Sequence, residues 1–144
     1  LHDLVDVARD DVRHFLGKGR SAFSAATIHV SRFKRLIITN PAHATTRQMS
    51  SVCHELGHIV LDHEAEAPLQ VTGSRTWNGV PEREADWLAG CLLIPNDAAH
   101  AAARSGRTDE DVAAAFGVSR SLAAWRMNTS GARIRAKRLS RFTR

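Results

Sequence analysis

Residues 54–58 read His-Glu-Leu-Gly-His, an H-E-x-x-H motif. Four residues along a helix turn the chain by about 400°, so His54 and His58 project from one face, a turn apart. Two imidazoles in this arrangement can hold one metal ion. Glu55, about 100° round the helix, can then reach a water in the open coordination position and act as general base. The spacing therefore predicts a catalytic metal site with Zn²⁺ as its metal.

The alternative is a surface helix that carries two histidines by chance. Against it stands the apolar character of the flanks, because buried polar groups need partners and a metal would supply one. We expect the helix to begin after Thr45 or Thr46 as N-cap and to end near Asp62, with Gly57 letting a strand or substrate approach the metal. The apolar flanking residues are Met49, Val52, Cys53, Leu56, Ile59, Val60 and Leu61.

The pattern along the chain predicts an α+β fold, with a small sheet packed on helices that include the H-E-x-x-H helix. Apolar residues at helical spacing predict a helix over residues 3–16, and β-branched runs predict strands over 26–30 and 35–39. Residues 64–80 carry Pro and Gly without helical period and indicate a loop. Pro81 suits the first position of the next helix.

The run from Glu82 to Asp86 reads Glu-Arg-Glu-Ala-Asp, an E-x-x-x-D pattern. In zinc peptidases whose third ligand is a glutamate, a downstream helix supplies that residue. We expect Glu82 to be this ligand and Asp86 to hydrogen-bond a ligand histidine, His54, and fix its tautomer. Glu84 is a rival ligand on a different helix face. The other interpretation of this run is a solvated charged surface.

These two stretches resemble the ImmA/IrrE metallopeptidases, whose pattern is HExGH followed by E-x-x-A-(N/D)-x-F-A-x-x-L-L-x-P. HELGH stands at residues 54–58 and EREADWLAGCLLIP at 82–95, with Leu88 where Phe is usual. The resemblance implies a cytoplasmic zinc endopeptidase that cleaves a repressor-type DNA-binding regulator in phage, mobile-element or stress-response control. It places the metal ligands at His54, His58 and Glu82 and the catalytic base at Glu55.

Several features of the chemistry stay open. The sequence contains no Tyr, so an oxyanion would need another donor, such as His63, His100, an Arg or a backbone N–H. At the end of its helix, His63 is expected to interact with the last carbonyl groups. Manganese or iron remain alternatives to zinc.

Residues 105–130 predict a helical hairpin that resembles a helix-turn-helix, with Thr108 and Ser119 as N-caps. One interpretation is DNA contact through Arg120, Arg126 and a basic C-terminal tail. The other, which we favour, is a hairpin packed on the peptidase domain.

The net charge of +5 belongs to the end of the chain, because residues 133–144 alone hold six Lys and Arg and no acid. We expect a peptidase domain over 1–104, the hairpin over 105–130 and a basic tail over 131–144. A DNA- or repressor-binding regulator with a non-catalytic metal site, or a toxin–antitoxin component, are the alternative functions.

The location expected for the chain is the cytoplasm. Cys53 and Cys91 lie in apolar helical patterns and suggest buried thiols rather than a disulfide framework. No apolar run reaches the roughly 18 residues of a membrane span, and no signal peptide is visible, so no membrane partner is expected.

Overall fold

The computed structural model describes residues 24–31, 33–63 and 79–142 and confirms the α+β architecture. The predicted helix over 3–16 lies outside these residues, as does the predicted loop except for its last two positions, which belong to a helix. The elements are β1 (Ala25–Ser31), β2 (Lys34–Thr39), α2 (Thr45–Val60), α3 (Gly79–Leu93), α4 (Asn96–Arg104), α5 (Asp109–Phe116), α6 (Arg120–Thr129) and α7 (Ala132–Phe142).

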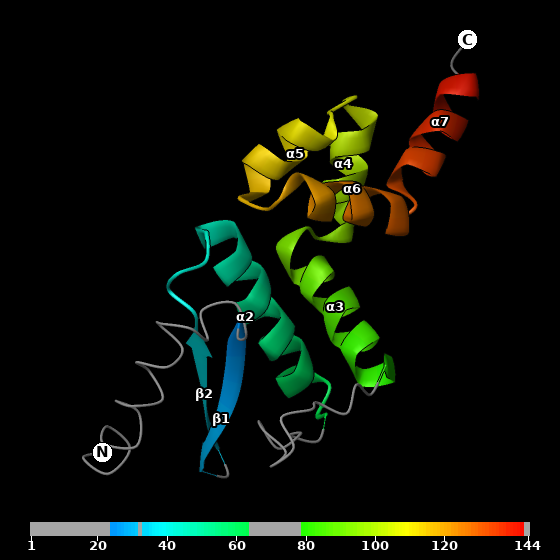
Figure 1. Cartoon of the computed structure of the whole chain (residues 1–144). Coiled ribbons are helices and arrows are strands. Elements are labelled where there is room, and N and C mark those ends of the chain that lie inside the picture. Colours follow the sequence, from blue (N-terminus) through cyan, green and yellow to red (C-terminus); the bar gives the residue numbers. More distant parts are fainter. Residues whose placement is uncertain (1–23, 32, 64–78, 143–144) are drawn as a thin grey trace.

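The two predicted strands are both present, and β1 and β2 form an antiparallel pair. Thr27 lies opposite Ile37, and the register shifts at an irregularity between His29 and Ser31. Helix α2 contacts both strands and also packs along α3, while α4 to α7 lie beyond one end of α3 (Figure 1). The helix that carries H-E-x-x-H therefore lies between the β-hairpin of β1 and β2 and helix α3.

The two ends of helix α2 are built differently. Ala44 is the N-cap residue and makes no side-chain hydrogen bond, so the predicted capping by Thr45 or Thr46 is wrong and both threonines lie inside the helix. The helix ends at Val60, close to the predicted end. Asp62 then adopts a left-handed conformation with φ of 53°, which reverses the direction of the chain.

Helices α2 and α3 approach each other closely at Gly57. A Cβ at this position would lie 2.9 Å from the carbonyl oxygen and 3.0 Å from the Cα of Ala85. The sequence led us to expect a strand or substrate beside Gly57, and that expectation is wrong about the neighbour. The missing side chain admits the backbone of α3 instead.

A cluster of buried apolar side chains joins the helices of the C-terminal part. Helix α4 takes part in this cluster, although its alanine-rich sequence gave no apolar stripe from which to predict it. The chain segments from the end of α3 to the start of α7 therefore share one core. Its members are Ile94, Ala99, Ala102, Val112, Val118, Ala123, Met127 and Ala132.

The helical hairpin of α5 and α6 has the predicted caps. The Thr108 side chain accepts from the backbone N–H of Asp111, whose carboxylate accepts in return from the Thr108 backbone N–H. The Ser119 side chain accepts from the N–H of Leu122. Gly117 links the helices in a left-handed conformation with φ of 62°. The turn chemistry read from the sequence is thus confirmed.

Arg126 serves the core rather than a nucleic acid. It is only 1% exposed, and its Nε donates to the carbonyl oxygen of Ile94 at 2.9 Å while the guanidinium also binds Asn96. Arg120 is exposed and pairs with Glu110 at 2.7 Å. DNA contact through Arg126 is therefore wrong, because its donors are used at the junction of α3 and α4.

The basic segment at the C-terminus forms a helix, which the sequence did not lead us to predict. Residues 132–142 make up α7, and this helix packs on α4 and α6. Arg133 contributes to that packing by binding Asn128 at 2.9 Å and by pairing with Asp109. The division of the chain at residues 104 and 130 stays a prediction.

Replacing Arg126 tests its structural role. Arg126→Met should lower the free energy of unfolding by about 1–3 kcal/mol, because it leaves the buried Ile94 carbonyl without its donor. Arg120→Met, which removes an exposed ion pair, is the matched control and should change it by less than about 1 kcal/mol. Urea denaturation measures both variants, and equal effects would contradict the assignment.

Candidate metal centre

Helix α2 presents two imidazoles on one face, as the four-residue spacing requires. The Nε2 atoms of His54 and His58 lie 3.0 Å apart, and the rings meet edge to face with centroids separated by 4.7 Å. Each side chain is between a fifth and a quarter exposed. The two ring nitrogens therefore converge on a single point at the helix surface.

Helix α3 adds a carboxylate to this pair. Glu82 lies in its first turn, and its Oε2 is 3.3 Å from Nε2 of His54 while its Oε1 is 3.5 Å from Nε2 of His58. Ligand atoms of these three residues all lie within 4.8 Å of one another. The structure thus brings together the three residues that the sequence selected, and they form a candidate metal site.

The separations fit a small tetrahedral cation. Zinc binds nitrogen and oxygen ligands at about 2.0–2.2 Å, so two ligands at a tetrahedral angle lie about 3.3 Å apart. The observed separations of 3.0, 3.3 and 3.5 Å scatter around that value. Two imidazoles and a carboxylate are also a donor set that zinc uses in hydrolytic enzymes. The residues present therefore fit the metal that the motif implies.

Asp86 contacts the side of the His54 ring that faces away from the cluster. Its Oδ1 lies 2.8 Å from Nδ1 of His54, the histidine with which the sequence paired it. An ionised carboxylate only accepts, so this contact is a hydrogen bond when Nδ1 carries the proton. The neutral ring then has its lone pair on Nε2, directed at the cluster.

Glu55 points from α2 towards the hairpin, and its partner there was missed by sequence reasoning. The hydroxyl of Thr27 on β1 donates to Oε2 of Glu55 at 2.6 Å. No local pattern links two residues that are 28 positions apart in different elements. Polar Thr27 in a β-branched run was the available signal, and it does not identify a partner.

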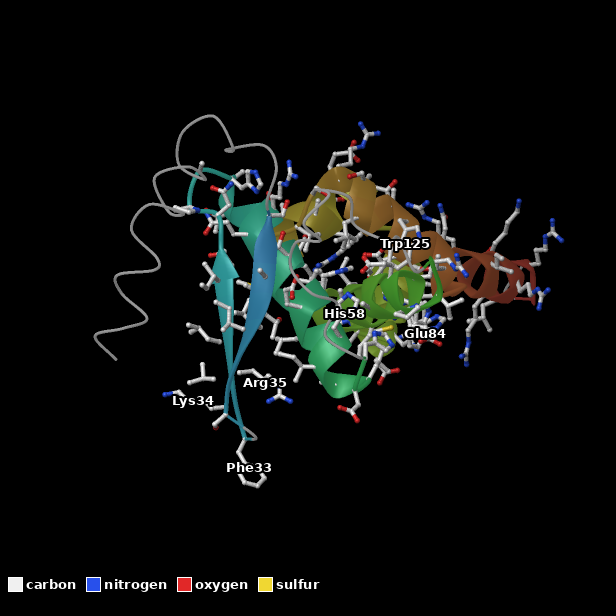
Figure 2. All side chains as sticks on the ribbon, turned by 60° about the horizontal axis from the view of Figure 1, so that its bottom comes forward. Phe33, Lys34, Arg35, His58, Glu84 and Trp125 are labelled. Atoms are coloured by element: carbon white, nitrogen blue, oxygen red, sulfur yellow. The ribbon has the colours of Figure 1, made fainter. Side chains whose placement is uncertain are left out.

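Glu84 lies outside the cluster of three. Its Oε2 is 3.1 Å from Nε2 of His63, and Nδ1 of His63 is 3.0 Å from Nδ1 of His58. Figure 2 labels His58 on α2 and Glu84 on α3. His63 does interact with a carbonyl of the last turn, through its backbone N–H, which donates to the carbonyl of His58 at 3.0 Å, whereas its side chain lies against His58 and Glu84. Because His63 contacts the His58 nitrogen that faces away from the cluster, it is also not placed to stabilise an oxyanion there.

The surroundings of His58 favour a neutral ring. Burial lowers its pKa, and the neighbouring His54 lowers it further, against the opposing effect of the Glu82 and Glu55 carboxylates. A neutral imidazole has the nitrogen lone pair that a metal requires. The local electrostatics therefore agree with a ligand role at neutral pH.

An open cleft of about 740 Å³ adjoins the cluster. His54 and Asp86 lie in its wall at one end, and it continues between α2, α3 and the start of α6. Trp87 and Trp125 give it aromatic surface and remain 54% and 38% exposed. Arg83 adds a positive charge. The cleft is thus an apolar and cationic surface beside the three candidate ligands.

An α+β fold with a His-His-Glu cluster on an H-E-x-x-H helix and its neighbour defines a metallopeptidase type of site. The family model described as the IrrE N-terminal-like domain, a peptidase family, matches residues 5–128. The chain belongs to this family.

A search of curated proteins and a search of solved structures each gave no significant match. Within the described part of the chain, no helix combines the length and the apolar character needed to cross a bilayer.

Substitution of the two glutamates separates ligand from neighbour. Glu82→Gln should lower zinc affinity by more than about 100-fold, because it removes a ligand. Loss of a residue that only hydrogen-bonds a ligand typically lowers affinity by about 10–100-fold. Glu84→Gln, two residues away, should lower zinc affinity by less than Glu82→Gln does. Competition with a fluorescent chelator measures both. A larger loss in Glu84→Gln would show that the rival carboxylate is the ligand.

Proposed function

We propose that this protein is a zinc-dependent endopeptidase whose substrate is a repressor-type DNA-binding protein. The observation that carries the proposal is the convergence of His54, His58 and Glu82, with the carboxylate of Glu55 close enough to act on the pKa of His58. A metal-binding regulator would need the three ligands, but it would not need a carboxylate held beside them.

The three ligands would hold the metal through two imidazole nitrogens and a carboxylate. Zinc bound there would supply Lewis-acid chemistry, polarising the scissile carbonyl and increasing the acidity of the attacking water. Asp86 supports this by keeping the proton of His54 on Nδ1, 2.8 Å away. The chain itself must then provide the proton transfers.

Glu55 is the proposed general base. Its carboxylate accepts a proton from the attacking water and afterwards gives it to the leaving amine nitrogen. The 2.6 Å hydrogen bond from Thr27 occupies one of its oxygens, Oε2, and leaves Oε1 for the water. Strand β1 thereby positions the base, because the donor belongs to the hairpin and the acceptor to α2.

The cleft supports a peptide substrate rather than a small molecule alone. Its volume of about 740 Å³ is large enough for several side chains, and it is continuous with the cluster through His54 and Asp86. Trp87 and Trp125 line the same cleft as His54, so side chains of a bound peptide away from the cleaved bond would contact aromatic surface.

The repressor substrate and the cytoplasmic location rest on the resemblance to the ImmA/IrrE metallopeptidases. The free thiols of Cys53, which is buried, and Cys91, which is half-buried, are consistent with a reducing compartment. Burial also raises the pKa of the Cys53 thiol, so it stays protonated and unreactive.

Glu55→Gln tests the mechanism. The amide cannot accept the proton, so the peptidase kcat should fall by about 10²-fold or more while zinc affinity remains near that of the parent. Thr27→Val, which removes only the hydroxyl, should cause a smaller fall in kcat, again with zinc retained. Hydrolysis of a fluorogenic peptide and of a helix-turn-helix repressor measures the rates. Undiminished hydrolysis by Glu55→Gln would exclude this role.

A second candidate function is duplex binding through α7, and one observation favours it. Residues 132–142 carry five Lys and Arg without an acidic residue, and four of them have no salt bridge within the described parts of the chain. Clustered cations of this kind bind phosphate. The four are Arg135, Lys137, Arg138 and Arg141.

Substitution of Arg135, Lys137 and Arg138 by Ala should weaken duplex DNA binding and reduce its dependence on salt, because fewer phosphates are neutralised. Fluorescence anisotropy at several salt concentrations measures both quantities. Lys34→Ala, at the hairpin tip beside the exposed Phe33 (Figure 2), is the control and should leave binding unchanged. Equal binding by the triple variant and the parent would argue against this function.

A further inference from the structure

We propose that His63 and Glu84 form a positioning pair that fixes the tautomer and the orientation of His58. This inference rests on the proposed metal site and deepens it. Asp86 would then orient one ligand histidine from α3, while His63 and Glu84 orient the other. His63 contributes no atom to the metal in this assignment, because it contacts the ring nitrogen of His58 that faces away from the cluster.

The end of helix α2 places His63 for this role. The N–H of His63 donates to the carbonyl of His58 at 3.0 Å, and the N–H of Asp62 donates to the carbonyl of Ile59 at 3.3 Å. Together with the left-handed φ of 53° at Asp62, these bonds form a Schellman motif. This motif brings the residue after Asp62 back over the last turn, and here that residue meets His58.

The hydrogen bonds form a continuous chain from a carboxylate to the cluster. Oε2 of Glu84 lies 3.1 Å from Nε2 of His63, and Nδ1 of His63 lies 3.0 Å from Nδ1 of His58. The two rings meet edge to face with an interplanar angle of 69°. The His63 side chain is only 11% exposed, whereas that of Glu84 is 57% exposed. His63 is therefore enclosed and its two nitrogens each have a defined neighbour.

When both rings are neutral, the hydrogen bonds from Glu84 through His63 to His58 allow only one arrangement of the protons on the ring nitrogens. An ionised Glu84 only accepts, so His63 carries its proton on Nε2 and has its lone pair on Nδ1. That lone pair can accept only if His58 carries its proton on Nδ1. The lone pair of His58 is then on Nε2, which is the nitrogen that lies 3.0 Å from Nε2 of His54.

The same reasoning assigns the proton of the other ligand histidine, His54. Asp86 directs the proton of His54 to Nδ1 and the lone pair to Nε2. Two lone pairs and the Glu82 carboxylate then face one point, an arrangement that repels itself unless a cation lies between them. The hydrogen bond from Asp86 therefore orients His54 for a metal, and the hydrogen bonds from Glu84 and His63 orient His58.

Zinc affinities of the intact chain test this assignment by double-mutant cycles. His63→Ala should lower affinity by about 10–100-fold, the range typical of residues that orient a metal ligand. Glu84→Gln should lower it less. The double variant of His63 and Glu84 should be no worse than His63→Ala alone, because both residues act through one chain. His63→Ala combined with Asp86→Asn should multiply the two losses, because these residues act on different ligands.

A conservative variant guards against a merely structural effect. In His63→Asn the amide oxygen can take the place of Nδ1 and accept from His58, so part of the lost affinity should return. In the His63→Asn background, Glu84→Gln should lower zinc affinity less than it does in the parent, since the shorter Asn side chain does not bridge His58 and Glu84 as His63 does. Glu110→Gln, which alters an exposed carboxylate paired with Arg120, is the matched control and should leave zinc affinity unchanged. Long-range ¹H–¹⁵N spectra of the zinc-loaded protein should show the His63 proton on Nε2.

The outcomes separate this inference from the proposed function. If the parent chain binds zinc tightly and His63→Ala binds it equally well, the positioning pair is excluded while the metal site stands. If His63→Ala and Glu84→Gln lowered zinc affinity independently, so that their losses multiplied, the claim that the two residues act together on His58 would also be wrong. A parent protein that does not bind zinc would overturn the metal site, and this inference with it.

Discussion

The close crossing of α2 and α3 is the constraint on which the site depends. Gly57 lies between the two ligand histidines in sequence, and its missing side chain lets the backbone at Ala85 approach to a distance that a Cβ would not permit. Glu82 is one turn before Ala85 on α3. The two backbones are thus in close contact one turn from Glu82, and a wider separation would withdraw the carboxylate from both imidazoles.

Every polar group at the cluster has a partner that comes from another element or from the turn after α2. The hairpin supplies Thr27 for Glu55, and α3 supplies Asp86 for His54. His63 meets His58. Polar networks in a partly buried site hold a defined geometry when their members are satisfied in this way. The site is therefore organised from both sides of α2 before any substrate arrives.

Much of this arrangement could be predicted because it is local. Helical spacing placed His54 and His58 on one face, and the capping residues at Thr108 and Ser119 needed only their own turn. The contact of Thr27 with Glu55 could not be predicted, because it depends on how two elements pack. The contact of the His63 ring with His58 could not be predicted for a related reason, since the position of His63 follows from the left-handed conformation of Asp62, which the sequence does not reveal.

Charge and composition misled in two further places. An Arg in an amphipathic helix is usually solvated, and nothing nearby in sequence indicates that Arg126 turns inward to the Ile94 carbonyl. Helix α4 has an alanine-rich sequence without large apolar residues to mark its inner face. Its alanines favour a helix by intrinsic propensity, but nothing in the sequence shows that Ala99 and Ala102 are the ones that pack in the core.

The junction between α3 and α6 ties the ligand helix to the C-terminal helices. The Trp125 ring lies where a Cβ on Gly90 would be, and Arg126 holds the carbonyl just beyond the last turn of α3. A fragment cut at residue 104 would keep all three candidate ligands and yet strip one end of α3 of its packing and its donor. Ligand helix and C-terminal bundle should accordingly melt in a single cooperative transition, so that loosening either one loosens the other.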